Sequence, residues 1–214
     1  MRMRRKHNLA SRIEKCSDYL VENPNAFRGL WLDGYDYGEL HIELGCGKGL
    51  FTTETAKASP EILLVALEKT ANVLVSALER AAMERLRNVR FLNVLVENLA
   101  DCFAPGEVSR IYINFCDPWP SNRHAKRRLT AQGFLEVYRQ ILRPDGEIHF
   151  KTDNGSLFDF SLREFESTGF TLSEETRDLH KNGPAGVMTD YESRFYEQGF
   201  PIYHSKHIMS IAGK

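Results

Sequence analysis

The sequence contains no apolar run long enough to cross a membrane as a helix. Its longest uninterrupted apolar run, Ile62 to Leu67, is far shorter than the ~20 residues that such a helix requires. No apolar stretch follows the basic N-terminus as it would in a secretory signal. We therefore expect a cytoplasmic protein with no membrane partner.

The four cysteines form no Cys-x-x-Cys pair. Cys16, Cys46, Cys102 and Cys116 are scattered along the chain, so their spacing indicates neither a zinc site nor a disulfide framework. We expect reduced thiols and no metal site.

The sequence also has no large excess of one charge, because its 28 Lys and Arg residues are nearly balanced by 29 Asp and Glu residues, for a net charge of −1. The positive charges are nevertheless clustered, which is typical of a surface that contacts nucleic acid. One cluster contains Arg2, Arg4, Arg5 and Lys6, and the other contains Arg123, His124, Lys126, Arg127 and Arg128. Each cluster could face phosphate. The alternative for the first cluster is a disordered terminus, and the alternative for the second is a solvated helix start.

Short apolar runs alternate with helix-like stretches along the chain, without an internal repeat. Strands are expected at 40–44, 62–67, 89–96, 111–115 and 147–152, and helices at 48–58, 71–86, 131–142 and 156–167, with a turn at 143–146. The second strand is too apolar to be half exposed, so the pattern predicts an α/β fold with a doubly wound, mostly parallel sheet. A short strand at 170–172, a loop at 181–186, a helix at 191–197 and a strand at 202–211 predict a C-terminal antiparallel hairpin at the sheet edge.

A glycine loop follows the first expected strand and opens the next helix. Glu43 precedes Gly45, Gly47 and Gly49, and glycines at this place let backbone N–H groups approach a ligand closely. Leu50 stands where a dinucleotide-binding pattern would have its last glycine. The acid suits a ligand with a cationic amino group and a sulfonium, and it would repel a pyrophosphate. The spacing therefore favours S-adenosylmethionine over a nicotinamide cofactor.

Glu68 ends the second expected strand, about twenty residues beyond the glycine loop, where an acid can accept hydrogen bonds from both hydroxyls of a ribose. The alternative is a glutamate that caps the following helix, whose N-terminus favours negative charge. The glycine loop upstream favours the cofactor role.

The segment NFCDPWP, residues 114–120, follows the fourth expected strand. Its two prolines stiffen the turn and remove two backbone donors, and Trp119 offers a flat face on which a base can stack. We expect the turn to hold Asp117 toward the ligand cleft. A rigid loop with a packed tryptophan is the alternative.

Over nearly its whole length the chain resembles the bacterial tRNA guanine-N7 methyltransferases. The resemblance rests on residues 43–49, 68–69, 115–120, 123–129, 151–154 and 189–192, followed by Phe195. It implies a Rossmann-like methyltransferase domain over 39–214, preceded by a basic arm and lead-in helix over 1–38. It further implies that S-adenosylmethionine is used to methylate N7 of guanine 46 in the tRNA variable loop. A monomer and a homodimer are both compatible with the sequence.

The resemblance also implies the roles of individual residues, with Asp117 as the catalytic one. The implied cofactor site contains Glu43, Gly45, Gly47, Gly49, Glu68, Lys69, Leu95, Val96 and Asp117. The implied substrate site contains Ser121, Asp153, Thr189, Asp190, Tyr191 and Glu192, and the implied RNA contacts are Arg123, His124, Lys126, Arg127 and Arg128. Asp153 and Glu192 are expected to accept hydrogen bonds from the N1–H and amino edge of guanine. For Asp153 the alternative is the N-cap of the following helix.

The chain departs from the family pattern at two positions. Leu95 stands where the family usually carries an acid that recognises the adenine amino group. Backbone groups at Leu95 and Val96 can still read the adenine, or the side chain of Glu97 or Asn98 can supply the acceptor. Ser121 stands where a lysine is common, so Arg123 is expected to take over its contact.

Guanine N7 carries an in-plane lone pair, so its methylation needs no prior removal of a proton. Asp117 is therefore expected to position the base and to offset the positive charge that develops on it. Two alternatives stay open: a methyltransferase for another base, since amino-directed enzymes place Asp/Asn-Pro-Pro-aromatic at this strand end, and a noncatalytic RNA-binding relative.

Overall fold

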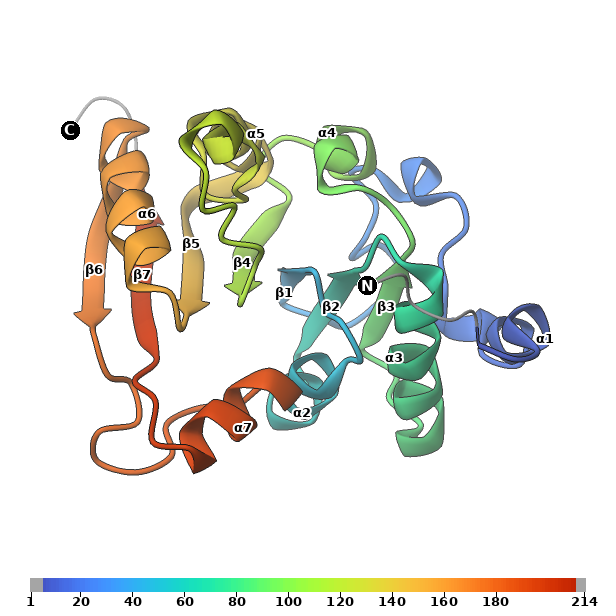
Figure 1. The fold of residues 1–214 in the computed structure, drawn as a ribbon. Coiled ribbons are helices and arrows are strands. Elements are labelled where there is room, and N and C mark those ends of the chain that lie inside the picture. Colours follow the sequence, from blue (N-terminus) through green and yellow to red (C-terminus); the bar gives the residue numbers. More distant parts are fainter. Residues whose placement is uncertain (1–5, 211–214) are drawn as a thin grey trace.

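The computed structural model describes residues 6–210 as an α/β fold with one seven-stranded sheet, in the order β3-β2-β1-β4-β5-β7-β6 (Figure 1). Five strands run parallel: β1 (Glu39–Leu44), β2 (Ile62–Leu67), β3 (Val89–Leu92), β4 (Val108–Asn114) and β5 (Leu142–Thr152). The strand β7 (Tyr203–Met209) lies antiparallel between β5 and the edge strand β6 (Phe170–Thr176). The prediction of a mostly parallel sheet with an antiparallel C-terminal pair is confirmed.

Helices cover both faces of the sheet, and alternate strand residues pack against them. The helices α4 (Leu99–Cys102), α5 (Gln132–Ile141) and α6 (Gly155–Ser167) share one hydrophobic core with Leu63 and Val65 of β2. The helix α3 (Ala71–Glu84) shares a second core with Ala66 of β2, and α2 (Leu50–Ala58) packs beside it. Because β2 is buried on both faces, it reads as a continuous apolar run in the sequence.

The chain before β1 packs onto this framework through short elements: α1 (Leu9–Glu14) and the 3₁₀ turns η1 (Ser17–Tyr19) and η2 (Pro24–Phe27). Arg12 of α1 forms an ion pair of 2.7 Å with Glu79 of α3. Trp31 is 2% exposed and donates its indole N–H to the carbonyl of Cys102 at 2.9 Å. Of the basic arm, Lys6 contacts Asn72 and Ser76 of α3; Arg2, Arg4 and Arg5 lie outside the described residues.

Three expected elements differ in detail. The third strand ends at Leu92, because the chain then turns into the 3₁₀ segment η3 (Val96–Asn98). The expected turn at 143–146 lies inside β5 as an irregularity of its pairing with β4, at which Asp145 adopts φ +61°. The C-terminal strands do not form a tight hairpin: residues 177–202, with α7 (Asp190–Glu197), connect them, and β7 lies between β5 and β6.

The carboxyl ends of β1, β2, β4 and β5 meet at one edge of the sheet. Strand order reverses between β1 and β4, and ligands of doubly wound sheets bind at such a switch point. The glycine loop, Glu68 and Asp117 all follow strands that end here. Within residues 6–210, no helix is both long and apolar enough to span a membrane.

Candidate active site

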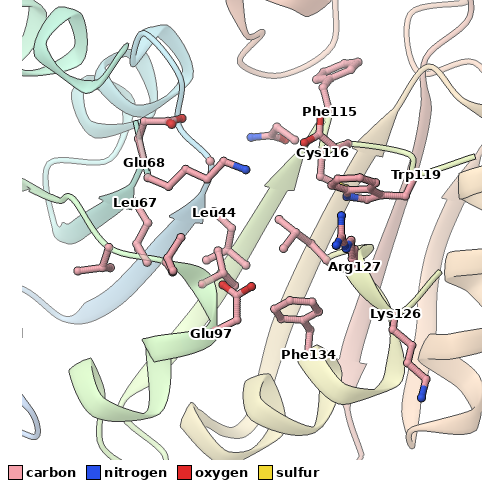
Figure 2. A pocket seen from close by; sticks show the side chains of 18 residues that line it. Leu44, Leu67, Glu68, Glu97, Phe115, Cys116, Trp119, Lys126, Arg127 and Phe134 are labelled. Atoms are coloured by element: carbon pink, nitrogen blue, oxygen red, sulfur yellow. The ribbon is translucent and has the colours of Figure 1, made fainter. Parts of the chain in front are cut away.

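A cavity of about 720 Å³ opens at this switch point (Figure 2). Its wall is built by the segments that follow β1, β2, β3 and β4, and by η4 (Asn122–Arg127) and α5. Of the residues expected to bind cofactor or RNA, it brings together Gly45, Glu68, Lys69, Leu95, Val96, Asp117, Lys126 and Arg127. Segments far apart in the sequence thus converge on one site, as the strand-end rule predicts.

The glycine loop turns sharply through the left-handed region, with φ values of +78° at Gly45, +59° at Gly47 and +81° at Gly49. Gly45 lines the cavity, whereas Gly47 and Gly49 do not. A side chain on Gly49 would place its Cβ 2.6 Å from the Cβ of Ala77. Gly49 therefore permits the close approach of α2 to α3, and Gly45 exposes backbone to the ligand space.

Glu43 lies beneath the glycine loop and not in the cavity wall. Its side chain is 1% exposed and accepts hydrogen bonds from the Thr52 hydroxyl at 2.5 Å and the Asn114 amide at 3.3 Å. Burial raises the pKa of Glu43 to about 7, although these two hydrogen bonds lower it. In this arrangement Glu43 braces α2 against β4, and its contact with a cofactor stays a prediction.

Glu68 lies in the cavity wall at the start of α3. Its Oε1 atom accepts a hydrogen bond of 2.8 Å from the backbone N–H of Thr70, and its other oxygen has no hydrogen bond to any described residue. The carboxylate thus serves the helix start with one oxygen and leaves the second available to a ligand. The contact of Glu68 with a ribose stays a prediction.

Leu95 and Glu97 both line the part of the cavity wall that follows β3, where Figure 2 shows the Glu97 side chain. Leu95 is 49% exposed, so an apolar side chain faces the ligand space. Glu97 lines the cavity and Asn98 does not. Of the two side chains expected to replace the missing acid, Glu97 is the one in position.

The Asp117 turn contains two residues other than glycine in the left-handed region, Phe115 at φ +52° and Trp119 at φ +41°. Such positions cost about 1–3 kcal/mol each and persist only where the surroundings enforce them. Here Arg128 enforces the conformation, since its guanidinium donates hydrogen bonds of 3.0 Å to the carbonyls of Pro118 and Trp119.

Arg128 was expected to contact RNA phosphate, but the structure directs its side chain into the protein. The residue is 8% exposed, and its guanidinium lies 4.3 Å from the ring centroid of Phe160. Its donors are directed at backbone carbonyls beneath the turn. Arg128 is therefore a structural residue of the Asp117 turn.

The remaining basic residues of η4 divide between the cavity and the outer surface. Arg127 stacks on Trp119, with 4.9 Å between the guanidinium carbon and the ring centroid, and Lys126 lines the cavity beside it. His124 packs its ring 5.7 Å from Trp119 and contacts Arg123. Ser121, Arg123 and His124 lie outside the cavity wall.

Asp153 follows β5, and its carboxylate accepts a hydrogen bond of 3.4 Å from the Tyr191 hydroxyl. The N-cap of α6 is Asn154, whose side chain accepts from the N–H of Leu157 at 2.8 Å. The alternative that Asp153 caps this helix is therefore wrong. The Tyr191 ring lies 5.1 Å from that of Phe115, which places α7 beside the Asp117 turn.

Thr189 and Glu192 form a capping box at the start of α7. Glu192 is 0% exposed and pairs with Lys151 at 3.0 Å, so in this arrangement its carboxylate is not available to the guanine that it was expected to contact. Its carboxylate is taken up inside the protein. Asp190 lies 3.6 Å from Arg80 of α3 in a partly exposed ion pair.

A family model described as a putative methyltransferase matches residues 38–205. The tRNA (guanine-N(7)-)-methyltransferase of Geobacillus sp. (strain WCH70) is 46% identical over 206 residues, which cover 95% of this chain and 93% of that protein. The enzyme of the same name from Lactococcus lactis subsp. cremoris (strain MG1363) is 43% identical and covers 95% of each chain. The chain belongs to the tRNA (guanine-N7-)-methyltransferase family.

Solved structures share the fold of this tRNA (guanine-N7-)-methyltransferase family member at low sequence identity. The 16S rRNA methyltransferase KamB aligns with a TM-score of 0.65 at 17% identity, over 82% of this chain and 90% of that one. A SAM-dependent methyltransferase from Aquifex aeolicus aligns with a TM-score of 0.57 at 14% identity, over 96% of this chain and all of that one. These likenesses establish the Rossmann-like fold.

Several residues around this family member's site were not assigned a role from the sequence, and three of them matter most here. Phe134 of α5 lines the cavity, and Lys151 and His180 surround Glu192. Lys151 directly precedes Thr152 and Asp153, and this position next to a predicted site residue is a weak indication that it belongs to the site. Phe134 and His180 stand in no motif, so only the tertiary fold shows that they belong to the site.

Proposed function

We propose that this protein transfers the methyl group of S-adenosylmethionine to N7 of guanine 46 in the variable loop of tRNA, in the cytoplasm. The observation that carries the proposal is the cavity at the switch point. It brings the acids Glu68, Glu97 and Asp117 into one wall with Trp119 and Arg127. Near-full-length relatives named tRNA (guanine-N(7)-)-methyltransferase support the same reaction.

The cavity residues fit S-adenosylmethionine. A volume of about 720 Å³ lies in the range of small-molecule sites. Gly45 offers backbone at the rim, Glu68 has a free carboxylate oxygen for the ribose hydroxyls, and Glu97 can accept from the adenine amino group in place of the missing acid. When bound, the cofactor supplies an electrophilic methyl group on its sulfonium.

Asp117 acts on the base by position and charge. Guanine N7 needs no deprotonation, and the methylated base is cationic, so a carboxylate beside the ring stabilises the charge as it develops. Holding the reacting atoms in line can supply up to about 7–11 kcal/mol. The rigid turn, fixed by Arg128 at the carbonyls of Pro118 and Trp119, keeps Asp117 in the cavity wall for this purpose.

Two cysteines near the cavity are prevented from competing for the methyl group. Burial raises the pKa of the Cys116 thiol to about 12, and it raises the pKa of Cys46 well above the usual range. Since the thiolate is the nucleophilic form, both side chains are unreactive thiols at neutral pH. The target base therefore meets no competing sulfur nucleophile.

Asp153 and the cations of η4 serve the RNA. Asp153 accepts hydrogen bonds from the N1–H and amino edge of guanine, beside the Tyr191 ring. Lys126 and Arg127, which line the cavity, contact phosphates of the flanking nucleotides. Trp119 stacks beneath Arg127 and offers a flat face to an unstacked base.

The direct test uses labelled S-adenosylmethionine and unmodified tRNA, followed by the chain cleavage chemistry specific for N7-methylguanine. We expect label in tRNA and cleavage at guanine 46. Label on an exocyclic nitrogen would show a methyltransferase for another atom. Binding of tRNA without transfer, or cleavage at another guanine, would overturn the proposal.

A further inference from the structure

Three polar side chains form a buried cluster behind the proposed guanine site. Lys151 lies on β5, His180 in the loop that follows β6, and Glu192 in the first turn of α7. They are 8%, 6% and 0% exposed, respectively. None of them lines the cavity that holds Asp117.

The cluster satisfies both carboxylate oxygens of Glu192. The Lys151 ammonium donates to Oε1 at 3.0 Å and to Oε2 at 3.1 Å. The backbone N–H of Thr189 donates to Oε2 at 3.1 Å, and the Nε2 atom of His180 lies 3.0 Å from Oε1. Glu192 therefore presents no free oxygen to a base.

The tautomer of His180 follows from its second contact. The backbone N–H of Ala185 donates to its Nδ1 atom at 3.1 Å, so the proton of a neutral imidazole sits on Nε2 and is donated to Glu192. Lys151 also donates to the carbonyl of Val187 at 2.9 Å. The cluster thus fastens the loop at residues 180–189, as well as α7, to β5.

Each anchored element carries a residue of the proposed guanine site. Asp153 lies two residues beyond Lys151 on the same strand end, and Tyr191 directly precedes Glu192 on α7. The Tyr191 hydroxyl donates to Asp153 at 3.4 Å, which closes the link between the two elements. Figure 1 shows α7 at the edge of the sheet where the parallel strands end.

We propose that Lys151, His180 and Glu192 are positioning residues that hold Asp153 and Tyr191 in the geometry required to bind guanine. Glu192 acts through this cluster and does not touch the base. The inference rests on the proposed function and assigns the cluster a role within that reaction. A buried ion pair adds little net stability, but removing one partner leaves an uncompensated charge, so the pair fixes one arrangement of the two elements.

The test is a double-mutant cycle of Lys151→Met and Glu192→Gln, in which kcat for tRNA methylation and the Kd for S-adenosylmethionine are measured. We expect each single variant to lower kcat roughly 10- to 100-fold, because misplacing a binding group by about 1 Å has an effect of this size. The Kd should change by less than about twofold, since the cofactor cavity is untouched. The double variant should be no worse than the poorer single variant.

If the losses of kcat in the two single variants multiply in the double variant, the inference is overturned, because Glu192 then has a contact of its own with the substrate. A wild-type kcat in Glu192→Gln would overturn it as well. Transfer by the wild-type protein, measured in the same assay, tests the proposed function separately. If the wild-type protein methylates N7 and the losses multiply, only the positioning role fails.

A second pair of variants avoids the buried charges, whose loss can unfold the protein. His180→Gln keeps an N–H donor at the place of Nε2, whereas His180→Leu removes it. We expect His180→Gln to retain near-wild-type kcat and His180→Leu to lower kcat without changing the Kd for S-adenosylmethionine. Equal kcat values for the two folded variants would overturn the role of His180.

Discussion

The Nε atom of Arg128 donates a hydrogen bond of 3.0 Å to the carbonyl oxygen of Pro118, the residue that follows Asp117. A second bond of 3.0 Å reaches the carbonyl of Trp119. The guanidinium therefore holds the turn that presents the proposed catalytic carboxylate. Its neighbour Arg127 lies instead in the cavity wall, over the Trp119 ring. Two adjacent arginines of one basic run thus have different tasks.

This division predicts opposite phenotypes for the two arginines. Arg128→Lys replaces the planar guanidinium, which reaches the two carbonyls with two separate nitrogens, by a single ammonium nitrogen, so it should lower kcat roughly tenfold and leave the salt dependence of tRNA binding unchanged. Arg127→Ala should reduce the slope of log K against log salt by about 0.7–0.9. Binding titrations across a salt series and kcat measurements check both, with Arg163→Ala, an exposed arginine on α6, as the control. A reduced salt slope in Arg128→Lys would contradict the assignment.

Glu97 is predicted to compensate for the apolar Leu95 in cofactor recognition. Because Glu97 lines the cavity and Asn98 does not, Glu97→Ala should weaken S-adenosylmethionine binding by roughly tenfold or more, which corresponds to the loss of a hydrogen bond to a charged group. Asn98→Ala is the matched control and should bind normally. Calorimetric titration measures both affinities. Equal affinities would show that the backbone alone reads the adenine.

The sequence predicted the framework well, because its signals are local. Glycines, prolines and apolar runs mark the strand ends, and so the sequence alone predicts Gly45, Glu68 and Asp117 at one edge of the sheet. Whether an individual polar side chain faces a ligand or is paired inside the protein depends on tertiary contacts, which the sequence does not show. Arg128 and Glu192 look like ligand-binding residues in their motifs, yet each is buried and satisfied by partners within the fold.

Glu43 is predicted to make the ligand-free protein less stable as the pH rises. Its folded-state pKa of about 7 exceeds the ordinary glutamate pKa of 4.5, so the folded state binds more protons than the unfolded state between these two values. The free energy of unfolding therefore falls as pH increases through this window, by up to about 3 kcal/mol, and levels off above it.

Denaturant unfolding of wild type and Glu43→Gln between pH 4.5 and 8 checks this prediction. The buried histidines His41 and His204 have pKa values lowered by burial to about 4, so they make stability rise with pH between about 4 and 6.5. Because both proteins contain these histidines, the difference between their free energies of unfolding reports on Glu43 alone. The wild type should lose stability relative to the glutamine variant as the pH rises. A difference that does not change with pH would refute the assigned protonation of Glu43.

In the proposed mechanism, Asp117 aligns guanine and offsets its developing charge without removing a proton. The most direct measurement is the single-turnover rate of methyl transfer to N7 for wild type, Asp117→Asn and Asp117→Ala, with the Kd for S-adenosylmethionine measured in parallel. We predict that Asp117→Ala loses most of the rate while it retains much of the cofactor affinity, and that Asp117→Asn falls between it and the wild type. A wild-type rate in Asp117→Ala would contradict the account.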